Sequence, residues 1–116
     1  MLQEQNIIVN VAGLNIDQEF KSNIQQIIDN NYSINHVFVA ADPENSFDPN
    51  AIAVFLNTSA GYFQIGYVAK KDHEKLRACI PEIWTQSHYA RIYSSGIGYD
   101  NNFYCQIEIM PRALIK

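Results

Sequence analysis

The acidic residues Asp42, Glu44 and Asp48 are the side chains of this sequence whose spacing best suits chemistry. They lie in the stretch DPENSFDPNAIAVF, residues 42–55, where two Asp-Pro pairs stand six residues apart before an apolar run. Carboxylates held close together could exchange protons with a substrate, or could hold a divalent ion. On an exposed turn they would instead be solvated and would cap backbone N–H groups, and this structural interpretation is favoured.

Phe47 is an aromatic residue in the middle of this polar, proline-containing segment. Such a ring either tucks under the loop as a plug or stands out as a platform on which a base can stack. The sequence makes the plug at least as good an explanation as the platform.

The other reactive side chains do not form a recognisable catalytic or metal site. His36, His73 and His88 are scattered, and no Gly-x-Ser-x-Gly elbow or His-x-x-x-His pair occurs. Cys79 and Cys105 are far apart and are expected on apolar faces as free thiols. The sequence therefore predicts a protein without catalytic residues, metal or cofactor.

Length and composition predict a single domain over residues 1–116. The chain is 47% hydrophobic and 17% charged, with no apolar run long enough to cross a bilayer and no secretory signal. A cytoplasmic location is expected. The formal net charge of −4 argues against indiscriminate nucleic-acid coating, because nonspecific phosphate binding depends on Lys and Arg. Any contact with nucleic acid must therefore be local.

The periodicity of apolar residues predicts several strands joined mostly by turns. The expected strands are residues 6–14, 34–41, 51–56, 62–69, 88–95 and 103–110. Gly66 lies inside the fourth, where glycine often marks a bulge or the close approach of another backbone. This order favours a mainly β, α+β fold: a small, partly open antiparallel barrel of OB- or SH3-like shape.

Two helices are expected to pack on this barrel. Asn15 or Asp17 can cap the first, which should stop at Asn30 and Asn31. The second begins near residues 70–72, has a basic outer face, and is shortened or kinked at Pro81. The apolar stripes of the two helices are Ile16, Phe20, Ile24, Ile27 and Ile28, and Leu76, Cys79, Ile80 and Ile83.

The acidic turn and the hairpin partner that follows it together resemble the HIRAN domain family. The matching positions are Pro43, Asn45, Phe47, Asp48, Asn50, Ala51, Ile52 and Val54 in the turn, and Gly66, Tyr67 and Val68 in the partner strand. The order of elements extends the resemblance over most of the chain. It implies a barrel related in shape to the OB-fold, which in some members holds the free 3′ end of single-stranded DNA.

The resemblance also implies roles for four residues of the turn. Phe47 would stack on the terminal base, and Asp48 would accept a hydrogen bond from the 3′-hydroxyl. Asn45 and Asn50 would shape or line the pocket. A carboxylate suits this role because it attracts a neutral hydroxyl donor and repels a terminal phosphate.

Tyr67, Lys70 and Lys71 would lie at the entrance of that pocket and meet the first backbone phosphates. A solvated helix start explains the two lysines equally well. Weaker candidates for phosphate contact are Lys75, Arg77 and Arg91.

The family pattern is incomplete at two places. Ala41 stands where members usually have Arg, and the first strand lacks the basic-aromatic pair of DNA-binding members. The expected function is a non-catalytic module for single-stranded DNA with a free 3′-hydroxyl, acting in DNA repair or replication-fork processing beside a helicase or repair protein. The alternative is a protein-interaction or structural adaptor that kept the barrel. A weaker third possibility is a nuclease-like accessory activity.

Overall fold

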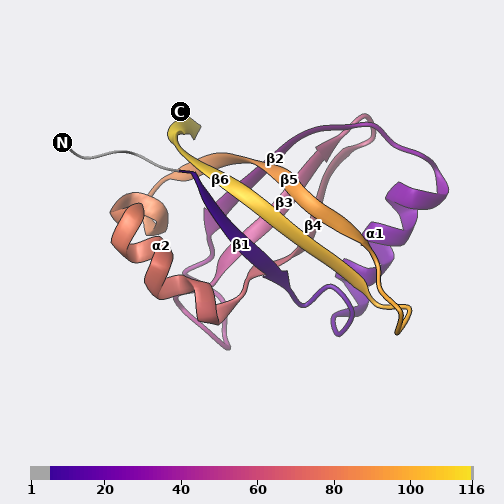
Figure 1. Ribbon diagram of the computed structural model, residues 1–116, viewed down its shortest axis with the longest axis horizontal. Helices are drawn as coiled ribbons and strands as arrows, with labels where there is room; N and C mark the ends of the chain where they lie inside the picture. The colour runs from indigo at the N-terminus through magenta and orange to yellow at the C-terminus, as the bar shows by residue number, and fades with distance from the viewer. Residues whose placement is uncertain (1–5, 116) are drawn as a thin grey trace.

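A closed antiparallel β-barrel forms the body of the protein in a computed structural model that describes residues 6–115 (Figure 1). Side chains are described over residues 6–110. The strand order around the barrel is β1-β4-β3-β2-β5-β6. The strands are β1 (Ile7–Ala12), β2 (Ile34–Ala41), β3 (Ile52–Thr58), β4 (Gly61–Val68), β5 (Ser87–Ile97) and β6 (Phe103–Ile115).

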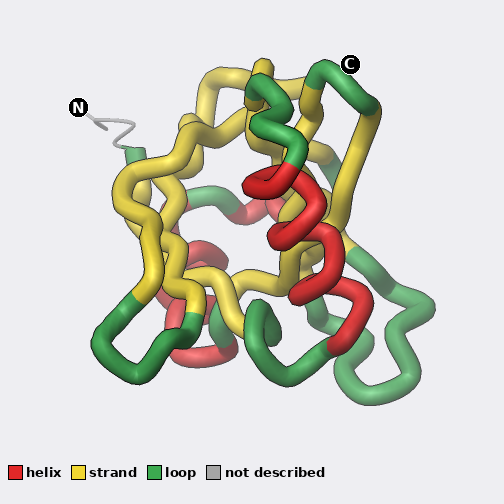
Figure 2. Tube along the Cα trace, turned by 90° about the vertical axis from the view of Figure 1, so that its right-hand side faces the viewer, coloured by secondary structure: helices red, strands yellow, loops and turns green. Residues whose placement is uncertain are grey.

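The expected small antiparallel barrel with two helices is confirmed. It is more complete than the partly open barrel that was expected, because β1 pairs with β4 on one side and with β6 on the other. Within residues 6–115, every strand of the closed sheet therefore has a neighbour on both sides. Figure 2 shows the strands as a ring, and the two helical segments lie at opposite ends of the molecule in Figure 1.

The core fills the interior of the barrel with every second side chain of the strands. Val9, Val37, Val39, Ile107 and Ile109 are all buried, as the alternating pattern predicts. β3 is buried at three consecutive positions where it begins, so both of its faces are covered there. Phe38 of β2 and Phe55 of β3 are only partly buried and stack on each other, with ring centroids 4.9 Å apart.

Gly66 allows the barrel to close beside the candidate site. It pairs with Val54, next to an irregularity in the β3–β4 register. A Cβ added at Gly66 would overlap the carbonyl oxygen of Ala12 in β1. The close approach of another backbone, expected from the sequence, is therefore confirmed.

Asp17 caps the N-terminus of helix α1 (Gln18–Asp29). Its carboxylate accepts hydrogen bonds from the N–H groups of Glu19 at 2.9 Å and Phe20 at 3.2 Å. The prediction that Ile16 belongs to the apolar stripe is wrong, because it precedes the cap and is 88% exposed. A residue before the cap lies outside the helical geometry whatever its spacing.

The second half of α1 presents Ile24 and Ile27 to the barrel, whereas Ile28 is half exposed. The helix ends at Asn30, followed by Asn31 with a positive φ of 52°. The predicted stop is therefore confirmed. Asn tolerates this left-handed conformation better than most residues.

The second helical segment is broken into short pieces, as Pro81 suggested. Leu76 and Ile80 are buried, but Cys79 is exposed, so its predicted place on an apolar face is wrong. Successive helical residues are rotated by about 100°, and Leu76 and Ile80, four residues apart, occupy the inner side. The pieces are η1 (Lys70–Asp72), α2 (His73–Cys79) and η2 (Pro81–Trp84). No helix within residues 6–115 is long and apolar enough to cross a membrane.

Candidate functional site

The acidic turn between β2 and β3 is closed by backbone hydrogen bonds. The N–H of Asp42 donates to the carbonyl oxygen of Ala51 at 2.8 Å. The N–H of Ala51 donates to the carbonyl oxygen of Asp48 at 3.0 Å. The N–H of Asn45 donates to the carbonyl oxygen of Asp42 at 3.1 Å. These bonds give the segment a defined shape although it contains no regular secondary structure.

Two side chains of the turn hold its backbone in place. The Asn45 Oδ1 accepts hydrogen bonds from the N–H groups of Phe47 and Asp48, both at 2.9 Å. The Asp48 Oδ1 accepts one from the N–H of Asn50, also at 2.9 Å. Asn45 and Asp48 therefore have the structural role that the residue types favour in turns.

Phe47 does not plug the loop but stands out from it. Its side chain is 95% exposed. The hydrogen bond that fixes its N–H holds the backbone so that the ring projects from the turn. An exposed aromatic face next to a carboxylate can stack on a planar group that carries a hydrogen-bond donor.

A cavity of about 470 Å³, which we call the turn cavity, opens beside this ring. It brings together five of the seven predicted site residues, namely Asn45, Phe47, Asp48, Tyr67 and Lys70. The other residues that line it are Ala12, Asp17, Asp42, Ser46, Ala51, Val68 and His73. Residues from the start of α1, the acidic turn, β4 and η1 thus meet at one place.

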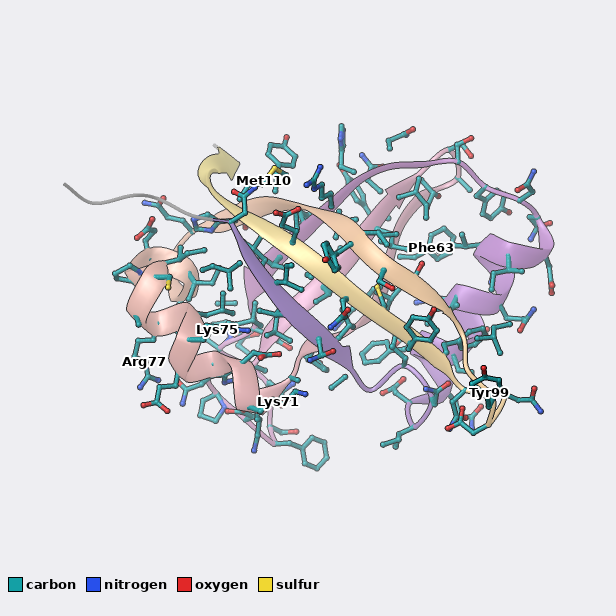
Figure 3. All side chains as sticks on the ribbon, in the orientation of Figure 1. Phe63, Lys71, Lys75, Arg77, Tyr99 and Met110 are labelled. Atoms are coloured by element: carbon teal, nitrogen blue, oxygen red, sulfur yellow. The ribbon has the colours of Figure 1, made fainter. Side chains whose placement is uncertain are left out.

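Asn50 and Lys71 do not line the turn cavity. The carbonyl oxygen of Asn50 accepts a hydrogen bond from the indole N–H of Trp84 at 2.9 Å, which ties the turn to η2. Lys71 is exposed on η1, in the same helical segment as Lys75 and Arg77 (Figure 3). Asn50 therefore connects the turn to η2 through its backbone carbonyl, and Lys71 lies outside the cavity.

The lining of the turn cavity is acidic. Asp17, Asp42 and Asp48 contribute three carboxylates against the single ammonium of Lys70. Lys70 Nζ is 3.9 Å from Asp48 Oδ2, but the lysine side chain is 79% exposed. An exposed pair at this distance stabilises the fold by less than about 1 kcal/mol. Negative charge therefore dominates the cavity.

Two carboxylate oxygens of the cavity lining, Asp42 Oδ2 and Asp48 Oδ2, are only loosely engaged. The hydroxyl of Tyr67 donates to Asp42 Oδ2 across a long 3.4 Å, and Asn45 Nδ2 is 3.5 Å from the same oxygen. Among the described residues, no hydrogen-bond donor satisfies Asp48 Oδ2. These oxygens can accept hydrogen bonds from a neutral donor and would repel an anion.

The weaker basic candidates are engaged in contacts with the fold. Lys75 donates to the carbonyl oxygen of Ile8 at 2.8 Å and pairs with the buried Asp72 at 3.3 Å. The Arg77 guanidinium lies 5.0 Å from the centroid of the Trp84 ring. These side chains stabilise the second helical segment at its contact with the barrel.

Arg91 lies outside the turn cavity, on the outer side of β5. It hydrogen-bonds to Glu108, its register partner on β6. This hydrogen bond is the main cause that lowers the pKa of the Glu108 carboxyl.

Two residues of the cavity were not anticipated from the sequence as site residues. Asp17 was expected only as a helix cap, and His73 only as a scattered histidine. His73 packs edge-on against Trp84, with ring centroids 6.0 Å apart, and its Nε2 is buried without a partner among the described residues. The only feature of the sequence that pointed to His73 as a site residue was its position directly after Lys70, Lys71 and Asp72.

The turn does not assemble the ion site considered for Asp42, Glu44 and Asp48. Glu44 is exposed and does not line the cavity. The part of the chain that the structure describes contains no group of three or more His, Cys, Asp or Glu side chains arranged to hold a metal ion.

The fold and the site together define a small closed antiparallel barrel with an acidic, aromatic-rimmed cavity. Comparison with protein-family models, with curated proteins and with solved structures finds no match for this chain. Its function must therefore be inferred from the chemistry of its residues.

Proposed function

We propose that this protein is a non-catalytic module that binds the free 3′-hydroxyl end of single-stranded DNA in the turn cavity. The observation that supports this best is the nearly complete exposure of Phe47 beside Asp48, whose Oδ2 is free to accept a hydrogen bond. The aromatic face stacks on any base, and the carboxylate accepts the proton of the terminal hydroxyl.

The charge of the cavity favours a hydroxyl end over a phosphate end. Three carboxylates and one lysine line it, so a terminal phosphate would meet net repulsion. The backbone phosphates of the strand would leave the cavity past Lys70 and reach Lys71 on the outer surface of η1. Few cations are available, because Ala41 and the described part of β1 supply none, so we expect modest affinity.

The resemblance of the turn and of β4 to the HIRAN family gives this proposal its biological setting. In that setting the module acts in the cytoplasm during DNA repair or replication-fork processing, beside a helicase or repair protein. Residues that match the family motif, Asn45, Phe47, Asp48 and Tyr67, line one cavity, and this supports their assignment to a common site.

The rival proposal is a protein-interaction adaptor, and one observation favours it. Carboxylates outnumber cations in the turn cavity, which also suits a Lys- or Arg-rich peptide. The two proposals differ in what they require of Phe47, because a ring at the mouth is essential for base stacking and is not needed by a basic side chain.

Fluorescence anisotropy with matched single-stranded oligonucleotides ending in a 3′-hydroxyl or a 3′-phosphate tests the proposal. Phe47→Ala should weaken binding about fivefold or more, since stacking of one base contributes about 1–3 kcal/mol. Asp48→Asn keeps an oxygen to accept from the Asn50 N–H but loses the charge, so it should abolish the preference for the hydroxyl end. Matched RNA oligonucleotides define the sugar preference.

Tyr99→Ala is the matched control, because Tyr99 is a fully exposed aromatic residue in the β5–β6 connection (Figure 3). It should leave binding unchanged. Equal affinity for both ends, or an equal loss in Tyr99→Ala, would overturn the proposal. Absence of oligonucleotide binding at low salt, together with an Asp48-dependent affinity for an oligolysine peptide, would establish the adaptor instead.

A further inference from the structure

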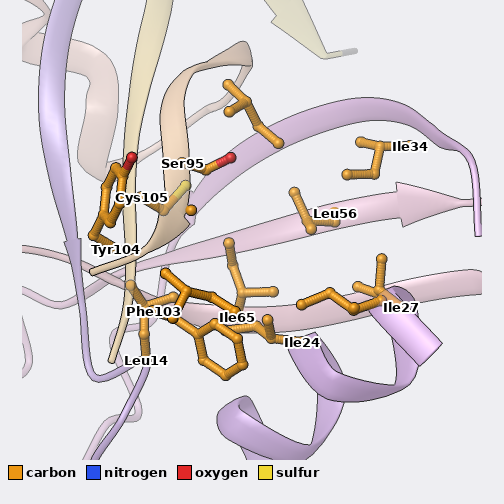
Figure 4. Close-up of a pocket in the computed structure, with 14 residues that line it drawn as sticks. Leu14, Ile24, Ile27, Ile34, Leu56, Ile65, Ser95, Phe103, Tyr104 and Cys105 are labelled. Carbon is orange, nitrogen blue, oxygen red and sulfur yellow. The ribbon is translucent and has the colours of Figure 1, made fainter. Parts of the chain in front are cut away.

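A second cavity, which we call the apolar cavity, has a volume of about 480 Å³ and lies between α1 and the β5–β6 hairpin (Figure 4). Small-molecule sites in proteins typically fall in the range of about 300–1,000 Å³. None of its lining residues carries a formal charge. They are Leu14, Ile24, Ile27, Ile28, Ile34, Leu56, Ile65, Ile92, Ser95, Gly96, Ile97, Phe103, Tyr104 and Cys105.

The rim of the apolar cavity exposes large apolar side chains. Of the nine large hydrophobic residues that are exposed within residues 6–110, four line this cavity: Ile28, Ile34, Ile97 and Tyr104. Single exposed hydrophobic residues are normal on protein surfaces, whereas several around one opening mark a binding site. An apolar ligand seated in the opening would remove this surface from water.

The polar groups of the cavity gather on one side. Figure 4 shows Ser95 and Cys105, which are register partners, together on the side away from α1, whereas Ile24 and Ile27 of α1 face Leu56 and Ile65. The Tyr104 ring lies over Gly96, on the other face of the β5–β6 hairpin. The Ser95 hydroxyl and the Cys105 thiol can satisfy a single neutral polar group. Burial raises the pKa of the Cys105 thiol to about 11, so this side carries no charge near neutral pH.

We propose that the apolar cavity binds an uncharged, mostly apolar small molecule that has one hydroxyl-like group at its end. The apolar chain lies against α1, and the polar end faces Ser95 and Cys105. A carboxylate of the same chain length is excluded, because the lining has no Lys or Arg to compensate a buried charge. This site is independent of the DNA end proposed for the turn cavity.

NMR of the isoleucine methyl groups provides a direct test, because seven isoleucines line the cavity and others lie elsewhere in the fold. The probes are 1-octanol and octanoate, which share a chain and differ in charge. With 1-octanol, the methyl groups of the cavity should shift along a saturable curve. Those of Ile16, Ile80 and Ile83 should not move. Octanoate should bind at least about tenfold more weakly.

Ile28→Glu and Ile16→Glu form a matched pair of variants. Both replace an exposed isoleucine of the same region, but only Ile28 lies on the rim. Ile28→Glu should weaken 1-octanol binding about tenfold, and Ile16→Glu should leave it unchanged. Shifts spread evenly over all isoleucines, equal binding of octanoate, or no shift at all would overturn the proposal. Shifts that depend on protein concentration would assign the rim to a second copy of the chain and also overturn it.

Discussion

The two ends of β2 meet cavities of nearly equal volume and opposite chemistry. Ile34, its first residue, lines the apolar cavity of about 480 Å³, and Asp42, the first residue after it, lines the turn cavity of about 470 Å³. Strand residues supply most of the lining of the apolar cavity, whereas residues of the connections and helix starts supply most of the lining of the turn cavity. One barrel thus carries two different chemistries, and fold alone does not determine function.

The cavities also differ in what holds their walls. Short-range hydrogen bonds made by Asn45 and Asp48 shape the turn cavity. Packing of α1 and of the β5–β6 hairpin shapes the apolar cavity. Single substitutions should consequently affect stability by different amounts at the two places.

Gly66→Ala should disrupt both cavities and should cause the largest loss in the free energy of unfolding. Gly66 lies between Ile65 of the apolar cavity and Tyr67 of the turn cavity, and a Cβ there would overlap the Ala12 carbonyl oxygen. We expect a loss of about 3 kcal/mol or more in the free energy of unfolding, measured by chemical denaturation. Gly98→Ala is the control, since its Cβ would approach chiefly the Asp100 side chain. Equal losses in both variants would contradict this role of Gly66.

Ile27→Ala and Phe47→Ala compare the two cavities directly. Ile27 is buried in the wall of the apolar cavity, so its truncation should cost about 2 kcal/mol or more in unfolding free energy. Phe47 projects into solvent, so its truncation should change that free energy by less than about 0.5 kcal/mol. Urea titrations of both variants check this difference, and a larger loss for Phe47→Ala would show that the ring is structural.

Asn45→Ala should cause a smaller loss in the free energy of unfolding, and the structural change should be confined to the turn cavity. It leaves the N–H groups of Phe47 and Asp48 without their side-chain acceptor and should cost about 1 kcal/mol. Asn45→Asp keeps an acceptor oxygen at the same place and should retain most of the stability. Thermal or urea unfolding of the two variants measures this, and equal losses would mean that the acceptor is unimportant.

Removing the Arg91–Glu108 pair, which lies outside both cavities, should change the free energy of unfolding least. The folded protein lowers the pKa of Glu108 below its ordinary value of 4.5, with the Arg91 hydrogen bond as the main cause. Its stabilisation is therefore complete above pH 4.5 and is lost as the pH falls through the lowered pKa. Arg91→Gln should flatten the pH dependence of unfolding in this acidic range. An unchanged pH profile in the variant would contradict the assigned cause.

The strands could be predicted from the sequence because alternation and β-branching are local signals. β2 and the buried start of β3 agree with the predicted ranges. Ile16 fits the helical period but lies outside α1, because Asp17 sets where the helix begins. Cys79 was misplaced because the short α2 buries Leu76 and ends at Cys79, directly before the buried Ile80.

The cavities themselves could not be predicted, because tertiary contacts assemble them. Asp17, Asp42 and Tyr67 are widely separated in the chain and meet only when α1 and β4 close on the turn. The sequence motif identified Phe47 as a candidate but could not decide between plug and platform. That choice depends on the orientation of the turn backbone, which the Asn45 side chain fixes.

Trp84 gives the acidic turn a built-in spectroscopic reporter. It is the only tryptophan of the chain, its indole N–H is bonded to the carbonyl oxygen of Asn50, and His73 packs against its ring. A shift of the turn would stretch that bond and move the ring relative to the histidine. Intrinsic emission should then change in wavelength or intensity, so occupancy of the turn cavity can be followed in real time with an unlabelled protein.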